Sequence, residues 1–370
     1  MRNKAIIAFA GLALAGALAG CSSGKNTLPS TTTTGFLFMV GPNNPNIVGF
    51  KTDATGAYST LSISSFPTGL RPISLVITPS KKFIYVANSS ANSVGGYSID
   101  GPTRILTPIG TALPPTPVGT LPISLAINSS GQFLYALNQG SSDISGLSLD
   151  SARGLMTPIS ASTFPTAATP TAMAISPNAG FLYVANATTI ATFAIAANGL
   201  LTPSGAPVLA PAGASLASIT IDPKGTFLYA SDAAHNNILS FSIAASGALT
   251  AVAGSPFSAG TQPAGIAIDS TSTFLFVANQ GSNNVSAFKI SAGVLTPVAG
   301  SPFATGSSIF NGLAPVFPVV DATNKFLYVG SSGSSDVAAF SINSTSGVLA
   351  PIANSPLFAN SAISWIIATN

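Results

Sequence analysis

The sequence contains no glutamate, one histidine and one cysteine, and only 6% of its 370 residues are charged. Acid–base catalysis near neutral pH depends mainly on histidine and on carboxylates with shifted pKa values, so few residues here could serve it. A transition-metal site is not expected either, because histidine and cysteine are its usual ligands. The sequence has no phosphate-binding loop, dinucleotide fingerprint or serine nucleophile motif, so we expect no cofactor.

The net charge is close to zero outside the N-terminal segment. The chain has 12 Lys and Arg residues and 9 acidic residues, all of them aspartate. Arg2 and Lys4 precede an apolar stretch, and without them the balance is 10 minus 9, or +1. Nucleic-acid binding needs clustered Lys and Arg, and no such cluster occurs, so we expect no nucleic-acid partner. The body of the chain also lacks an apolar run of about 18 residues that would predict a membrane span.

Residues 1–20 have the features of a bacterial lipoprotein signal peptide. Arg2 and Lys4 form a positively charged start, and residues 5–20 are an apolar stretch too short to span a membrane comfortably. The residues that end in Cys21 resemble a lipobox, in which cleavage precedes a lipidated cysteine. An ordinary cleaved signal followed by a chance cysteine is the alternative.

The lipoprotein interpretation divides the chain into three segments. Residues 1–20 are the signal peptide, 21–34 are the lipidated Cys21 and a Ser/Thr-rich tether, and 35–370 form the folded domain. Ser22 occupies the place where aspartate would favour retention in the inner membrane. We therefore expect an exported protein that is anchored by its lipid at the outer membrane or cell surface. The anchor uses the single thiol, so the fold must be stable without a disulfide.

One six-residue phrase recurs seven times along the chain. Its spacing varies only from 46 residues (Phe181 to Phe227) to 52 residues (Phe274 to Phe326). A fixed period of this size in β-rich units predicts a propeller or a solenoid. The Phe and Tyr of each copy are expected to pack between neighbouring repeats. The copies begin at Phe36, Phe83, Phe133, Phe181, Phe227, Phe274 and Phe326.

Each repeat predicts four short strands. In the unit 262–303, strands are expected at 264–269, 274–279, 284–290 and 294–298, separated by turn residues. The chain enters this pattern in a second strand at Phe36 and ends with a first strand at 363–369. The last strand can therefore complete the first blade and leave no open edge. The sequence predicts an all-β fold, a single seven-bladed β-propeller with four antiparallel strands per blade.

The repeated phrase, with its N-N-V-S-A-F, G-x-L-T-P and P-x-x-I-A-I-D companions, resembles the lactonase family of seven-bladed propellers. This family is 6-phosphogluconolactonase-like and is related to YVTN-repeat surface proteins, and the resemblance covers about residues 35–370. It implies sugar-lactone hydrolysis, with a His in a Pro-x-His opening of a first strand and Glu and Arg beside it in a central pocket. The matching positions in this sequence hold Ser74, Ser124, Ala172 and Gly265.

His235, Asp232 and Arg71 are the candidate catalytic residues. His235 is the only conventional base near neutral pH, and Asp232 three residues earlier could orient its imidazole toward water at a lactone carbonyl. Arg71 precedes a first strand and could hold a carboxylate or phosphate. All three are expected on the face that carries the loops between second and third strands. The alternative is a solvated histidine beside a solvated aspartate, and a surface arginine on a blade linker.

Four of these loops are rich in Asn, Asp, Ser and Gly. Their oxygen atoms could bind Ca²⁺, but side-chain-to-backbone turns explain the same residues without a ligand, and we favour the turns. We therefore predict no metal site. The loops are 138–143, 232–237, 279–284 and 331–336.

Two functions remain open at this point. The first is a lipid-anchored, monomeric binding module without catalysis, whose partner is a glycan, a small lactone or a protein at the propeller face. The second is a lactone hydrolase, which requires Arg71 and His235 to lie within about 10 Å so that one substrate touches both. Because these two residues belong to different blades, we expect them to be far apart. Whether the protein is an enzyme is not decided by the sequence.

Overall fold

The computed structural model describes residues 33–101, 103–110, 115–306, 312–353, 355–358 and 362–369. The signal peptide, Cys21 and most of the tether lie outside the described residues. Residues from Thr33 onward form one compact unit. Its regular elements are β-strands, and within the described ranges no helix is long and apolar enough to cross a membrane.

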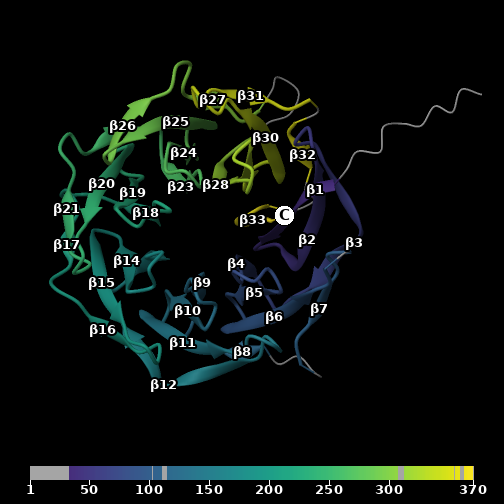
Figure 1. Ribbon diagram of the computed structural model, residues 1–370, viewed down its shortest axis with the longest axis vertical. Helices are drawn as coiled ribbons and strands as arrows, with labels where there is room; N and C mark the ends of the chain where they lie inside the picture. Colours follow the sequence, from purple (N-terminus) through teal and green to yellow (C-terminus); the bar gives the residue numbers. More distant parts are fainter. Residues whose placement is uncertain are drawn as a thin grey trace, which may run out of the picture. The chain divides into compact units, whose positions relative to one another are not determined.

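Seven antiparallel sheets are arranged in a ring, each with its first strand at the centre and its last strand at the rim (Figure 1). The first strands are β4 (Pro72–Ile77), β9 (Pro122–Ile127), β13 (Pro170–Ile175), β18 (Leu216–Ile221), β23 (Pro263–Ile268), β28 (Pro315–Val320) and β33 (Trp365–Thr369). The second strands are β1 (Thr33–Gly41), β5 (Phe83–Asn88), β10 (Phe133–Asn138), β14 (Phe181–Asn186), β19 (Phe227–Asp232), β24 (Phe274–Asn279) and β29 (Phe326–Ser331).

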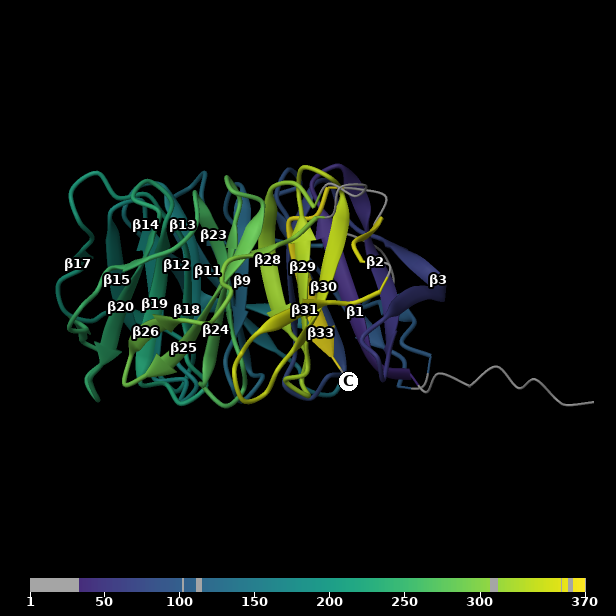
Figure 2. The ribbon, with the colours of Figure 1, turned by 90° about the horizontal axis from the view of Figure 1, so that it is seen from above.

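The third strands lie between the second strand and the outer strand of each blade, and all are longer than the first strands. They are β2 (Asn44–Asp53), β6 (Ser93–Ile99), β11 (Asp143–Leu149), β15 (Thr189–Ile195), β20 (Asn237–Ile243), β25 (Asn284–Ser291) and β30 (Asp336–Ile342). We number the blades 1 to 7 by their second strands, so that blade 1 contains β33 and β1 and blade 7 contains β28 and β29. Figure 2 shows the strands running from one face of the ring to the other.

The outer strand is continuous in two blades and interrupted in five. It is one ten-residue strand with a bulge in β3 (Tyr58–Pro67) and β12 (Met156–Pro165). In the other blades two short pieces pair with opposite ends of the third strand. The pieces are β7 (Leu106–Pro108) and β8 (Thr116–Pro117), β16 (Leu201–Pro203) and β17 (Val208–Leu209), β21 (Leu249–Ala251) and β22 (Phe257–Ser258), β26 (Val294–Pro297) and β27 (Phe303–Ala304), and β31 (Leu349–Pro351) and β32 (Leu357–Phe358).

The predicted closure of the ring is confirmed. β33 pairs antiparallel with β1, with Trp365 opposite Val40 and Thr369 opposite Phe36. It also contacts β28 of blade 7 and β4 of blade 2, so the first strands form an unbroken circle. Both ends of the described chain therefore lie in one sheet, and β33 covers the inner edge of β1 that would otherwise be unpaired.

The repeated phrase is buried because its two faces serve two different interfaces. Side chains alternate along a strand, so residues i and i+2 face one neighbour and residues i+1 and i+3 face the other. Tyr135 and Leu137 of blade 3 pack against Leu182 and Val184 of blade 4. Full burial of one such side chain contributes about 1.5–3 kcal/mol. The expected packing of Phe and Tyr between blades is confirmed.

Tyrosine hydroxyls also join neighbouring blades. Tyr85 donates a hydrogen bond to the carbonyl of Gly154 in the next blade at 2.8 Å. Gly154 is required here because its φ is 71° and an added Cβ would lie 2.6 Å from the ring of Phe83. The same bond joins Tyr135 to Gly199 (2.7 Å), Tyr183 to Gly247 (3.0 Å) and Tyr328 to Gly56 (3.0 Å).

Candidate functional site

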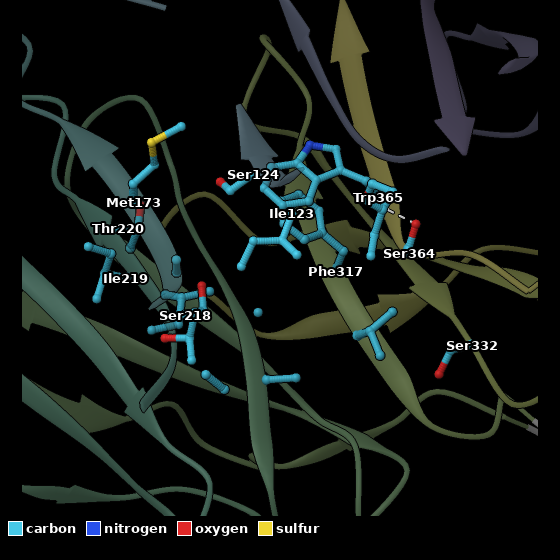
Figure 3. Close-up of a pocket in the computed structure, with 18 of the residues that line it drawn as sticks. Ile123, Ser124, Met173, Ser218, Ile219, Thr220, Phe317, Ser332, Ser364 and Trp365 are labelled. Atoms are coloured by element: carbon cyan, nitrogen blue, oxygen red, sulfur yellow. Dashed lines mark hydrogen bonds between the residues drawn. The ribbon is translucent and has the colours of Figure 1, made fainter. Parts of the chain in front are cut away.

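A cavity of about 680 Å³ occupies the middle of the ring (Figure 3). This volume is within the range of small-molecule sites. First-strand residues form its walls, and Pro42, Gln139, Gln280 and Ser332 border it at one end. These four residues belong to the loops between second and third strands. We call this side of the ring the loop face.

The strand register identifies one position that repeats in every blade and lines the cavity in every blade except blade 2, where the residue is buried. Ser74 of β4 is the third residue from the opening Pro72 and lies opposite Ala87 of β5. We call this the third position, and five blades have a small residue there, whereas two adjacent blades have an aromatic residue. The set is Ser74, Ser124, Ala172, Ser218, Gly265, Phe317 and Trp365.

Phe317 and Trp365 stack on each other at the third positions of blades 7 and 1. Their ring centroids are 3.9 Å apart and their planes differ by 28°. Both side chains are partly exposed and line the cavity. The neighbouring strand leaves no room for a side chain, because a Cβ on Gly265 would lie 2.4 Å from the carbonyl oxygen of Val316. The cavity therefore has one aromatic wall, which we define as Phe317 and Trp365.

The ring order places blades 4 and 5 across the cavity from blade 1. Their lining includes Thr171 and Met173 of blade 4 and Ser218 and Thr220 of blade 5. Figure 3 shows Met173, Ser218 and Thr220 on the side of the cavity away from Phe317 and Trp365. Thr171 donates a hydrogen bond to the carbonyl of Ala185 at 3.2 Å. Every described residue that lines the cavity is uncharged.

His235 and Asp232 form the predicted pair in the loop between β19 and β20. His235 Nδ1 lies 2.6 Å from Asp232 Oδ2, and the imidazole is 40% exposed while Asp232 is fully buried. Burial by itself raises the pKa of Asp232. Hydrogen bonds from the Ser215 amide and from His235 outweigh burial and hold the pKa of this carboxyl below its ordinary value. Neither residue lines the central cavity.

Asp232 occupies a place that is structural in other blades. Its Oδ1 accepts the amide N–H of Ser215, in the segment that leads into β18, at 2.9 Å. Asn88 accepts the N–H of Gly69 in the same way, and Asn279 accepts the N–H of Gly260, both at 3.1 Å. The last residue of the second strand thus fixes the incoming segment of its own blade. Asp232 performs this task in blade 5 and offers its second oxygen to His235.

Arg71 lies apart from this pair. It belongs to blade 2, and blades 3 and 4 separate it from His235 in the shorter direction around the ring. Its side chain is exposed and is not part of the cavity wall. Its φ is positive (55°), as it is for residues that precede first strands in other blades. These residues are Leu121, Thr169, Gln262 and Ala314. The structure therefore brings His235 and Asp232 together and leaves Arg71 on a different blade.

The Asn- and Asp-rich loops bond mainly within themselves. Asn138 Nδ2 donates to Asp143 Oδ1 at 2.6 Å, and Asn279 Nδ2 donates to Asn284 Oδ1 at 2.7 Å. In the ranges that the structure describes, no three His, Cys, Asp or Glu residues form a group suited to a metal ion. Side-chain turns account for the composition of these loops.

Sequence reasoning missed the aromatic wall. Trp365 falls within the predicted closing strand 363–369, but no site was expected there, and Phe317 was not considered. A signal was present, since five first strands have Ser, Ala or Gly at the third position and two have a large ring.

Comparison with known families agrees with this architecture. Residues 36–169 and 202–310 match the family model described as "Lactonase, 7-bladed beta-propeller". The chain belongs to the lactonase family. Comparison of this lactonase-family chain with curated proteins found no match.

Solved structures share the fold at low sequence identity. A provisional 6-phosphogluconolactonase from Bacteroides uniformis has a TM-score of 0.78 and 19% identity, covering 90% of this chain and 99% of that one. The periplasmic gluconolactonase of Pseudomonas aeruginosa has a TM-score of 0.76 and 15% identity, with coverage of 91% and 99%. Hydrazine synthase of Kuenenia stuttgartiensis has a TM-score of 0.60 and 16% identity, with coverage of 84% and 95%. At these identities the likeness concerns the fold of this family member alone.

Proposed function

We propose that this lactonase-family propeller binds a small uncharged molecule in its central cavity and does not hydrolyse it. One observation carries the proposal: the lining of the 680 Å³ cavity combines apolar, hydroxyl and amide side chains without a formal charge. Such a lining can desolvate and orient a neutral ligand. A charged ligand would lose its hydration there without gaining an ion pair.

The proposal that the ligand is not hydrolysed is supported by what a lactonase must supply. Attack of water on a lactone needs a positioned base and donors for the developing oxyanion. At the third positions, where the resemblance implies a histidine, the cavity has small residues and the aromatic wall. Serine and threonine hydroxyls are weak nucleophiles unless a neighbouring base activates them, and His235 lies in an outer loop.

Lactone hydrolysis is the second candidate function. It is favoured by membership of the family and by the bond of 2.6 Å between His235 Nδ1 and Asp232 Oδ2. This bond would leave Nε2 of the neutral imidazole able to accept a proton from water. The substrate would then lie on the loop face near blade 5, and Arg71 would take no part.

We also propose that the protein is a lipid-anchored, monomeric envelope component with Cys21 as its anchor. The support is the signal-like segment 1–20 and the single cysteine that follows it. Expression of wild type and Cys21→Ser tests this. The wild type should partition into detergent and the variant into the aqueous phase, and equal partitioning would reject the anchor.

The functional test is hydrolysis of glucono-δ-lactone, with and without a 6-phosphate, by the full-length chain in detergent. Wild type is compared with His235→Ala and with buffer alone. We expect the wild-type rate to equal the buffer rate. Catalysed hydrolysis that His235→Ala abolishes would replace the binding proposal with the second candidate.

Ligand charge is tested separately by calorimetric titration. Neutral ring compounds, such as glucose, cyclohexanol and phenol, are compared with glucose 6-phosphate and gluconate. We expect binding only among the neutral compounds. Equal or tighter binding of the charged compounds would overturn the proposal.

A further inference from the structure

The cavity is strongly asymmetric, although the seven blades repeat one pattern. Blades 2 to 6 have small residues at the third position, and only blades 7 and 1 have large rings there. Two adjacent substitutions of this kind change the shape of one side of the cavity and leave the other side open. The asymmetry calls for a functional explanation that ring closure alone does not supply.

The aromatic wall is held in place by its backbone. Ser364, next to Trp365, donates a hydrogen bond from Oγ to the carbonyl of Ile73 at 3.1 Å, which joins the closing strand to blade 2. Opposite Phe317, Gly330 has no room for a side chain, because a Cβ there would lie 2.6 Å from Cγ2 of Ile363. The rings therefore stand on strands whose positions are fixed by close contacts. A rigid platform loses little entropy when a ligand stacks on it.

Aromatic and hydroxyl groups face the cavity from opposite sides. The aromatic wall lies on blades 7 and 1, and the hydroxyls of Ser218 and Thr220 lie on blade 5 (Figure 3). Ser124 of blade 3 and the amides of Gln139 and Gln280 add further uncharged donors and acceptors. A ligand that fits both sides has a flat apolar face and an edge of neutral hydroxyl groups.

We infer that the aromatic wall of Phe317 and Trp365 is a stacking platform for the ring of an uncharged saccharide. The C–H face of the sugar lies on the exposed aromatic surface, and its hydroxyls bond to Ser124, Ser218 and Thr220. This inference rests on the proposed binding function and names its ligand class and the residues that determine specificity.

The composition of the cavity distinguishes this class from others. A phosphorylated or carboxylated sugar would need a cation in the wall, and none of the described lining residues provides one. A purely apolar ring would stack equally well but would leave the hydroxyls of the opposite wall without partners. A neutral sugar satisfies both walls.

Trp365 provides a direct readout because it is the only tryptophan in the chain. The full-length protein is titrated with methyl glycosides of glucose, galactose, mannose and N-acetylglucosamine, and with cyclohexanol and glucose 6-phosphate. We expect a saturable change in tryptophan emission with at least one glycoside. Cyclohexanol and glucose 6-phosphate should bind at least tenfold more weakly.

Variants distinguish a loss of ligand stacking from a loss of protein stability. Phe317→Leu should weaken glycoside binding about tenfold, whereas Phe303→Leu, which alters a partly exposed phenylalanine on the rim strand β27, should leave it unchanged. Ser218→Ala should weaken glycosides but not cyclohexanol. Trp365→Phe, measured by calorimetry, keeps a ring and should retain partial binding where Trp365→Leu loses it. Thermal unfolding by circular dichroism confirms that each variant is folded.

Two results would overturn the inference while the proposed function survives. One is binding of neutral compounds, seen by calorimetry, without any change in tryptophan emission or any effect of Phe317→Leu. The other is cyclohexanol binding as tightly as the best glycoside. Failure of all neutral compounds to bind would instead remove both the inference and the proposed function.

Discussion

Asp232 and Asp336 lie at the same end of two blades, and their pKa values are shifted in opposite directions. Both are buried, with exposed fractions of 0% and 3%. Asp232 ends a second strand and Asp336 begins a third strand, so both belong to loops on the loop face. The pKa of Asp232 is held below its ordinary value, whereas burial raises the pKa of Asp336.

The balance between burial and hydrogen-bond donors explains the difference. At Asp336, hydrogen bonds from Ser334, Ser331 and the Gly312 amide lower the pKa, but burial outweighs them. Asp232 accepts the N–H groups of Ser215 and Ala234 on one oxygen and His235 on the other. Asp336 has an oxygen, Oδ1, without a hydrogen-bond partner in the described part of the chain. Burial alone therefore does not set the charge of an aspartate here, because N–H groups aimed at the carboxylate can reverse its effect.

The largest effect is expected from Asp232→Ala. The change removes the carboxylate of Asp232, which is the hydrogen-bond partner of the Ser215 amide and of the His235 imidazole. We expect a loss of about 3 kcal/mol in the free energy of unfolding at pH 7, measured with urea. Asp232→Asn should lose less than half of this, since Asn88 and Asn279 perform the same task. Equal losses for the two variants would contradict the role of the shared acceptor.

Asp336→Asn should stabilise the protein at neutral pH, by about 1–2 kcal/mol. A carboxyl with a raised folded pKa contributes stability below its ordinary pKa and loses it as pH rises through the folded value. Asn237 and Asn284 already occupy the equivalent position in blades 5 and 6. Melting temperatures from pH 3 to pH 8 should show the gain only at the upper end. A gain that is constant across this range would indicate that charge is not its cause.

Lowering the pH should reduce the stability that Asp232 contributes, whereas it increases the stability that Asp336 contributes. Its lowered pKa gives stability that is present above the ordinary value near pH 4 and is lost as pH falls through the folded pKa. The difference in unfolding free energy between wild type and Asp232→Asn should therefore shrink on acidification. If this difference grows below pH 4, the assignment of the charged form is incorrect.

Two buried tyrosines show the same kind of contrast for an uncharged group, the phenolic hydroxyl. Tyr135 donates its hydroxyl to Gly199, but the hydroxyl of Tyr229 has no partner among the described residues, because Ser240 donates to Gly293 in its place at 2.7 Å. Tyr135→Phe should cost about 1 kcal/mol, whereas Tyr229→Phe should be neutral or slightly stabilising. Urea unfolding of both variants measures the contrast. Equal losses would show that the hydroxyl of Tyr229 is satisfied in solution.

The smallest effect is expected from His235→Ala. The imidazole is 40% exposed, so its loss should cost only about 0.5–1 kcal/mol. The same variant serves as the control for hydrolysis, and it should leave glycoside binding in the central cavity unchanged. A large decrease in that binding would contradict the position of His235 outside the cavity lining.

The sequence predicted the ring because its signal is repeated. Seven copies of one buried strand leave few alternatives, and the final first strand at 363–369 predicted the closure. The interruption of the outer strands was not predicted. In blade 5, Gly254 at a positive φ and Pro256 lie between β21 and β22 and break the ladder.

The site was predicted only where it is local in sequence. His235 and Asp232 are three residues apart, so their contact could be expected from the loop alone. Phe317 and Trp365 are far apart in the chain and meet across the junction of blades 7 and 1. Their contact depends on the register after a bulge that follows the opening proline in β28, and single-strand patterns do not reveal this register.

The closing strand links folding and recognition in one equilibrium. β33 follows the other strands in the chain, and it carries Trp365 to the cavity when it pairs with β1. A ring with β33 detached would lack half of the aromatic wall, so a ligand that needs the wall binds only the closed form. Mass action then requires the ligand to hold the last strand in place, and detachment of that strand to release the ligand.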